Sequence, residues 1–246
     1  HNGAAIHTGR VQNWLRDLEL SDDDLRCGPQ EPSDEEARTA LFADGDTPCQ
    51  YHNNCSGKHS GFLTLSKHLS AGPEYIDPDH AVQVAAKEAM ERTTGLPTLG
   101  YGIDGCSAPN FATTLHGLAK AMSVFATAAD GTAAHRLTNA MMAHPELVAG
   151  EGRACTHIMR AAPGELAVKT GAEGVFIAIL PKLQKSIALK IVDGATRASE
   201  CALAAILVKL GVLGADDPTA LRFTAAPQPN RRGINAAVVR AAPALI

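Results

Sequence analysis

Residues 174–181 read Gly-Val-Phe-Ile-Ala-Ile-Leu-Pro, and residues 186–194 read Ser-Ile-Ala-Leu-Lys-Ile-Val-Asp-Gly. Both runs are rich in β-branched residues and a short polar link separates them, which predicts an antiparallel hairpin. Residues 195–210 then carry apolar positions at helical spacing and end before Gly211. We therefore expect a helix that packs across the hairpin, in a fold of the α/β class, α+β type, with an antiparallel sheet flanked by helices.

Helix-start signals elsewhere in the chain add further helices to this sheet. Each consists of a capping residue or a proline just before an apolar-periodic run. The predicted starts are Ser33 with Glu36 ahead of residues 37–42, Asp79 ahead of residues 82–90, and Pro109 ahead of a pattern that reaches Phe125.

Length and composition limit the class of protein. A chain of 246 residues with 45% hydrophobic content can bury a substantial core, and we expect one domain over residues 1–246. The formal net charge of −4 and the lack of a basic run argue against a nucleic-acid or acidic-membrane partner. No apolar stretch approaches the roughly 20 residues that cross a bilayer, so a cytoplasmic protein that binds small molecules is expected. The six cysteines have no repeating spacing, which predicts reduced thiols.

The segment 51–62 reads Tyr-His-Asn-Asn-Cys-Ser-Gly-Lys-His-Ser-Gly-Phe, and its small and polar residues suit a site better than a core. Cys55 and Lys58 are three residues apart at a predicted helix start, so their side chains share one face. Cys55 could be a nucleophile with Lys58 as its base, or Cys55 and a distant thiol such as Cys106 could bind a metal beside Lys58. The structural alternative is a buried Cys beside an exposed Lys.

Lys58 can ligate a metal or accept a proton only when it is neutral. Moving its pKa from about 10.4 to near 7.5 costs about 4 kcal/mol, which a nearby cation would supply.

Two other segments are candidates for chemistry. Residues 104–109 read Asp-Gly-Cys-Ser-Ala-Pro, a turn in which Asp104 could fix a substrate amine or only cap the turn. Lys169-Thr170-Gly171 precedes the hairpin, and Lys-Thr-Gly accompanies Ser-x-x-Lys in serine β-lactamases and penicillin-binding proteins. A lysine on an edge strand could tune a nucleophilic serine and Thr170 could hold a carboxylate, but residues 1–246 contain no Ser-x-x-Lys.

The first residue, His1, is a poor nucleophile, and His1-Asn2-Gly3 could equally border a site or be a terminal segment without a role. The absence of an initiator Met favours a chain that begins inside a longer gene product.

Four segments share order and spacing with a known family. Residues 1–3, 52–62, 104–107 and 168–174 closely resemble the Rhizobium etli-type L-asparaginases, and residues 193–197 agree as well. That family is related in fold to serine β-lactamases, penicillin-binding proteins and one group of glutaminases. It hydrolyses L-asparagine to L-aspartate and ammonia.

The resemblance implies a role for each matching residue, and it implies zinc as the cofactor and a homodimer as the assembly. Zinc would position the substrate rather than generate hydroxide. The implied assignments are zinc ligation by Cys55, Lys58 and Cys106, catalysis by Lys169 and His1, and substrate binding by Asp104, Asn2, His59 and Thr170.

The departure from the family pattern concerns the nucleophile. Family members carry a Ser-x-x-Lys segment well upstream and a second serine just before His-Asn-Gly, and neither is present in residues 1–246. We expect this chain to lack the N-terminal part of the family domain and to be inactive unless that part is supplied. The alternatives are a glutaminase, a penicillin-recognising relative, and an inactive zinc-binding or ligand-binding protein.

Overall fold

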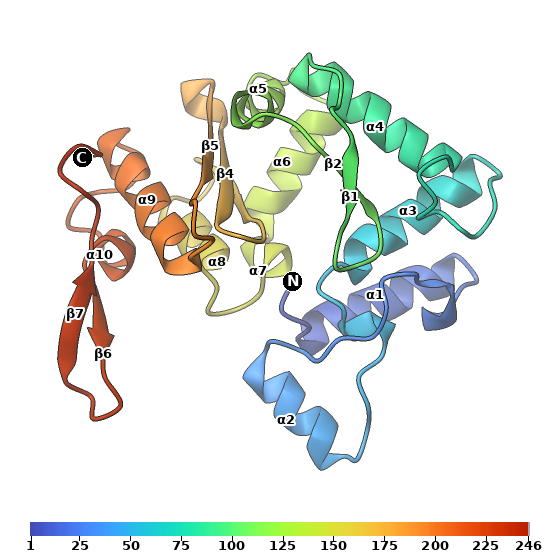
Figure 1. Cartoon of the computed structure of the whole chain (residues 1–246), viewed down its shortest axis with the longest axis horizontal. Coiled ribbons are helices and arrows are strands. Elements are labelled where there is room, and N and C mark those ends of the chain that lie inside the picture. The colour runs from blue at the N-terminus through green and yellow to red at the C-terminus, as the bar shows by residue number, and fades with distance from the viewer. Residues whose placement is uncertain (246) are drawn as a thin grey trace. The chain divides into compact units, whose positions relative to one another are not determined.

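The computed structural model describes residues 1–245 and divides the chain into two compact units, residues 1–114 and residues 115–246. Helices alternate with small antiparallel sheets in it, as the hairpin and the helix-start signals predict (Figure 1). The expectation of one amidohydrolase domain over residues 1–246 stays a prediction. Within the described residues, no helix has the length and apolar content to cross a membrane. All six cysteines are free thiols in the described residues.

The first unit is mainly helical, with one short hairpin. Its elements are α1 (Ala5–Asp17), η1 (Asp22–Asp24), α2 (Glu35–Ala43), η2 (Gln50–His52), α3 (Ser56–His68), α4 (Ala81–Thr94), β1 (Tyr101–Ile103) and β2 (Pro109–Phe111). Helix α1 lies beside α3, and Trp14 on α1 donates a 3.0 Å hydrogen bond to Thr64 on α3 (Figure 1). The core between them includes Leu15, Leu63 and the fully buried Tyr75.

The second unit contains the predicted sheet. Its elements are α5 (Leu115–Ala126), α6 (Ala133–Ala143), α7 (Pro145–Val148), α8 (Ala154–Ala161), β3 (Ala167–Thr170), β4 (Val175–Leu180), η3 (Pro181–Leu183), β5 (Lys185–Lys190), α9 (Thr196–Lys209), α10 (Pro218–Thr224), β6 (Ala226–Pro229) and β7 (Asn235–Val239).

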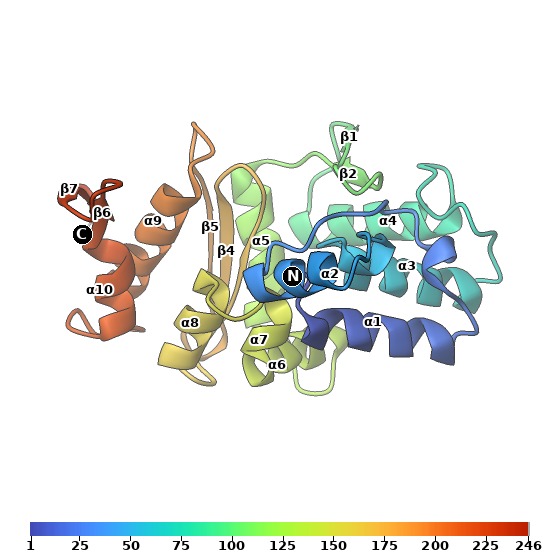
Figure 2. The ribbon, with the colours of Figure 1, turned by 90° about the horizontal axis from the view of Figure 1, so that it is seen from below.

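The order β3-β4-β5 makes β3 an edge strand, and both pairings are antiparallel. Figure 2 shows the sheet between α5 on one face and α9 on the other. The predicted hairpin and its covering helix are therefore confirmed.

Three helix starts differ from the sequence predictions. Asp34, rather than Ser33, caps α2 by accepting from the Ala37 N–H, because the Ser33 hydroxyl donates to the Asn2 carbonyl instead. His80, rather than Asp79, caps α4. Pro109 begins strand β2, which pairs with β1, and the helix of that region begins only at Leu115.

Gly174 fixes the turn between β3 and β4 because no side chain fits there. Its φ is +70°, and a Cβ at this position would lie 2.9 Å from the Ile191 Cβ and 3.1 Å from the Gly194 carbonyl carbon. Gly164 has a similar φ of +72° but open space around it. Comparing substitutions at these two glycines therefore separates the effect of backbone strain from the effect of steric overlap.

We expect Gly174→Ala to destabilise the second unit by about 1–3 kcal/mol more than Gly164→Ala. Both alanines would be strained at a positive φ, but only the alanine at position 174 would also overlap with neighbouring atoms. Hydrogen exchange of peptides from β4 and β5 measures the difference. Equal exchange rates in the two variants would contradict the steric account.

Candidate metal and substrate site

The predicted helix start at Cys55 is confirmed, and a buried asparagine fixes it. Cys55 is the N-cap residue of α3. The Asn53 side chain donates from Nδ2 to the carbonyls of Cys27 (2.8 Å) and Gly28 (3.1 Å), and its Oδ1 accepts from the Cys55 N–H at 2.8 Å. Both N–H donors of this buried amide and one lone pair of its oxygen are thereby directed to the backbone. Asn53 thus holds Cys55 in place rather than facing a ligand.

The second half of the site is the turn between β1 and β2. The Asp104 N–H donates to the Ala108 carbonyl at 2.9 Å, and the Ser107 N–H donates to the Asp104 carbonyl at 2.8 Å. Asp104 Oδ1 also accepts from the Gly105 N–H at 2.8 Å. The turn therefore presents Asp104 and the buried Cys106 from one rigid loop.

Four side chains from these two segments converge. The thiol sulfurs of Cys55 and Cys106 and a carboxylate oxygen of Asp104 all lie within 4.8 Å of one another. Lys58 Nζ lies 3.1 Å from the Cys106 Sγ and 3.8 Å from the Asp104 Oδ2. The structure thus brings Cys55, Lys58 and the distant Cys106 together, and their role as zinc ligands stays a prediction.

The two thiols share one proton unequally. The hydrogen bond with Cys55 lowers the pKa of Cys106 well below its ordinary value, and contacts with His59, the Ala108 backbone and Lys58 act in the same direction against the effect of burial. The same hydrogen bond and burial raise the pKa of Cys55. The contacts of this pair with each other and with Lys58 therefore favour one ionised sulfur, and the directions of the two pKa shifts place it on Cys106.

Lys58 is an ammonium ion in this arrangement. Burial lowers its pKa, but the hydrogen bond to Cys106 and the negative charge of the cysteine pair and of Asp104 outweigh that effect and raise the pKa above its ordinary value. Its side chain is still 41% exposed. Lys58 would therefore ligate a metal only after giving up its proton.

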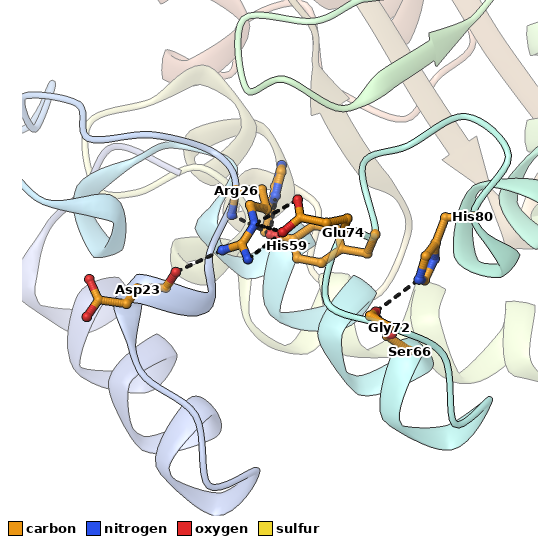
Figure 3. A network of polar contacts seen from close by, with 8 residues as sticks. Asp23, Arg26, His59, Ser66, Gly72, Glu74 and His80 are labelled. Atoms are coloured by element: carbon orange, nitrogen blue, oxygen red, sulfur yellow. Dashed lines mark hydrogen bonds and ion pairs between the residues drawn. The ribbon is translucent and has the colours of Figure 1, made fainter.

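His59 and Tyr75 form a buried support beside the thiolate that sequence reasoning missed. The Tyr75 hydroxyl accepts from the Arg26 N–H at 2.6 Å and lies 2.8 Å from His59 Nδ1. Figure 3 shows His59 next to Arg26, whose guanidinium pairs with Glu74. A hydroxyl that accepts from Arg26 can also donate to Nδ1, and in that arrangement Nε2 carries the ring proton. Nε2 is buried without a hydrogen-bond partner in residues 1–245, yet His59 is near enough to lower the pKa of Cys106.

We expect Tyr75→Phe to destabilise the first unit by about 1–3 kcal/mol, because the partly buried Arg26 N–H and the buried His59 Nδ1 both lose their partner. Trp14 is the only tryptophan of the chain and lies on α1, so its fluorescence during urea unfolding reports this unit. Tyr101→Phe is the control, since Tyr101 is 52% exposed and should change stability by less than about 0.5 kcal/mol. Similar losses of unfolding free energy in the two variants would show that the buried Tyr75 hydroxyl does not stabilise the unit more than the exposed Tyr101 hydroxyl does.

His1 and Asn2 lie in the same unit but contact other residues. His1 Nδ1 accepts from the Gly3 N–H, so its Nε2 carries the proton and donates to the Ser56 hydroxyl at 3.0 Å. In this tautomer His1 cannot take a proton from Ser56, which is itself fully buried. The buried Asn2 donates to Asp34 Oδ2 at 3.0 Å. The predicted roles of His1 in catalysis and of Asn2 and His59 in substrate binding stay predictions.

Lys169 and Thr170 belong to the second unit. Both lie on β3, so the prediction of a lysine on an edge strand is confirmed. Lys169 is exposed, and the Thr170 N–H donates to the buried Cys155 sulfur at 3.3 Å. Their predicted roles as base and carboxylate ligand stay predictions.

The donor set fits a zinc ion. Thiolate sulfur is the preferred protein ligand of zinc, and Cys106 is already ionised while Cys55 lies beside it. Two residues, Lys58 and Asp104, are close enough to supply a third donor.

One comparison with known proteins decides the family. The model of the family described as L-asparaginase II matches residues 1–241. The chain belongs to the L-asparaginase II family. It is accordingly an amidohydrolase of the asparaginase type, as the motif resemblance indicates. No curated protein matches the chain.

Proposed function

We propose that this chain belongs to an enzyme that hydrolyses L-asparagine to L-aspartate and ammonia. The observation that carries the proposal is the convergence of Cys55, Lys58, Asp104 and Cys106 on one small site in a chain of the L-asparaginase II family. Such a cluster offers a soft metal site and a carboxylate side by side. An α-amino acid substrate needs a carboxylate for its ammonium group, and Asp104 has the charge and partial exposure for that role.

In this proposal Cys55, Lys58 and Cys106 hold zinc. A bound zinc ion would supply a fixed positive charge that helps to position the substrate. The protein residues have separate tasks: Asp104 binds the substrate ammonium group, while Cys55 and, to a smaller extent, His59 held by Tyr75 lower the pKa of Cys106. Lys169 serves as the base and Thr170 holds the substrate carboxylate.

The chemical step is acyl transfer to a serine. The serine oxygen attacks the side-chain amide carbon, ammonia leaves with the serine proton, and water then hydrolyses the ester to aspartate. Residues 1–246 contain no Ser-x-x-Lys segment, so the proposal assigns the nucleophile to an upstream part of the gene product. A cytoplasmic homodimer is the assembly that accompanies this proposal.

Ammonia release from L-asparagine tests the function. It should be measured for residues 1–246 and for the product of the complete reading frame, side by side. Turnover by the longer product alone supports the proposal together with its serine. Turnover of L-glutamine but not L-asparagine, or acylation by a penicillin, would replace asparaginase with one of the related activities. Zinc binding without any turnover in either protein would leave a metal-binding role.

A further inference from the structure

A cavity of about 260 Å³ in the second unit is lined by three arginines. Arg153 is the N-cap residue of α8, Arg197 lies in the first turn of α9, and Arg222 lies in the last turn of α10. Strands β6 and β7 complete the wall with Gln228 and Val239. Every lining residue belongs to this one unit, and none belongs to the site with Cys55 and Cys106.

Two of the three arginines, Arg153 and Arg197, stand where helix electrostatics disfavours them. A helix N-terminus carries a partial positive charge, so acidic residues are favoured there and basic ones are not. Helices α8 and α9 nevertheless have no acidic residue in their first turn and no side-chain cap, and each places an arginine at its start. By contrast, Asp217 caps the neighbouring α10. An anion in the cavity would remove this conflict at both helices at once.

None of the three guanidinium groups takes part in a salt bridge or a side-chain hydrogen bond within residues 1–245. Arg222 lies over the ring of its neighbour Phe223, and the one carboxylate that interacts with Arg153 and Arg222 is that of Glu200. Glu200 lies three residues after Arg197 on α9 and lines the same cavity, but it does not pair with Arg197. Burial raises the pKa of Glu200 although Arg153 and Arg222 oppose that effect. With Glu200 ionised, three positive charges and one negative charge leave the lining at +2.

From the lining charge and the size of the cavity, we propose that it binds a tetrahedral dianion: inorganic phosphate or the phosphate group of a small phosphorylated metabolite. A dianion neutralises the net +2 charge, and guanidinium forks match phosphate oxygens in pairs. Drug-sized ligands occupy pockets of about 300–1,000 Å³. This cavity suits a small ion or monoester better than a nucleotide. The proposal is independent of the asparaginase activity.

Calorimetric titration with inorganic phosphate at pH 8, in a buffer of constant ionic strength, tests the site. Arg197→Gln and Arg222→Gln should each weaken binding about 10-fold or more, because each removes a charge-assisted contact. Both residues are exposed, so these variants should fold normally. Glu200→Gln should tighten binding severalfold, because it removes the only negative charge of the lining.

Arg231→Gln is the matched control, since Arg231 is an exposed arginine of the same unit outside the lining. Unchanged affinity in this variant supports the proposal. Equal weakening in Arg231→Gln, or no phosphate binding by the unaltered chain, would overturn it. A parallel titration with methyl phosphate identifies which form of phosphate the cavity binds. Tighter binding of methyl phosphate than of inorganic phosphate indicates a phosphorylated metabolite, and weaker binding indicates the free ion.

Discussion

Cys106→Ser should lower the affinity of the chain for zinc at least about 100-fold. Losing a partner of a metal ligand already costs about 10–100-fold, and this change removes a ligand itself. Cys106 is the thiolate of the site, whereas a serine hydroxyl stays protonated at neutral pH. Lys58, whose ammonium group lies 3.1 Å from that sulfur, also loses its anionic partner. Competition with a chromogenic chelator at fixed pH measures the change.

Cys201→Ser is the control for this experiment. Cys201 is also buried, but it lies on α9 in the other unit. Its variant should bind zinc as the unaltered chain does. A second readout follows the protein rather than the metal: a chelator should lower the urea midpoint reported by Trp14 in the unaltered chain, but not in Cys106→Ser. Zinc affinity that survives Cys106→Ser would remove this residue from the ligand set.

Sequence patterns correctly predicted those helices and strands whose formation depends mainly on their own residues. The apolar runs of β4 and β5 and the helical spacing of α9 are such cases, and the structure contains all three. The helix start at Cys55 was also predictable, since small and polar residues surround it. These elements form because neighbouring residues agree on one period.

Two of the helix starts were mispredicted because a contact from outside the predicted motif changed the local outcome. Ser33 has a good N-cap side chain, but its hydroxyl bonds to the Asn2 carbonyl and leaves the cap to Asp34. Pro109 can open a helix, yet it can also begin a strand that has a partner, and β1 supplies that partner. Neither competing contact is visible in the residues next to the prediction.

For the candidate site too, local spacing predicted some contacts and distant contacts decided the others. The spacing of Cys55 and Lys58 placed them together, whereas the approach of Cys106 depends on the β1–β2 turn and was only a possibility until the family motifs were combined. Tyr75 was missed because a tyrosine in a polar loop gives no signal of burial. The only sign in the sequence that Tyr75 is buried is that an aromatic residue stands here, between Glu74 and Ile76, in a segment otherwise rich in turn residues.

Asp104→Ala should lower kcat/KM for L-asparagine about 10- to 100-fold in the complete gene product. The proposed contact is a charge-assisted hydrogen bond between the Asp104 carboxylate and the substrate ammonium group, and such bonds contribute about 1.5–3 kcal/mol. Asp104 Oδ1 is held by the Gly105 N–H, which fixes the carboxylate in place. Steady-state ammonia release at several substrate concentrations gives the value.

A substrate without the amine separates binding from a structural effect. Succinamate is L-asparagine lacking its α-amino group, so it cannot use the proposed contact. Asp104→Ala should therefore reduce turnover of L-asparagine strongly and of succinamate little, and the preference between the two substrates should narrow by the same 10- to 100-fold. Equal losses for both substrates would mean that Asp104 acts by holding the turn rather than by binding the amine.

The zinc content of the same variant assigns the third ligand. Lys58 and Asp104 both lie beside the thiols, and the proposed function uses Lys58 for the metal and Asp104 for the substrate. Asp104→Ala should then retain zinc, while Lys58→Met, which keeps the length of the side chain and removes its nitrogen, should lose it. If Asp104→Ala loses zinc and Lys58→Met retains it, Asp104 rather than Lys58 is the third zinc ligand. The narrowed substrate preference would then need another source, because a carboxylate bound to zinc has less negative charge to offer an ammonium group.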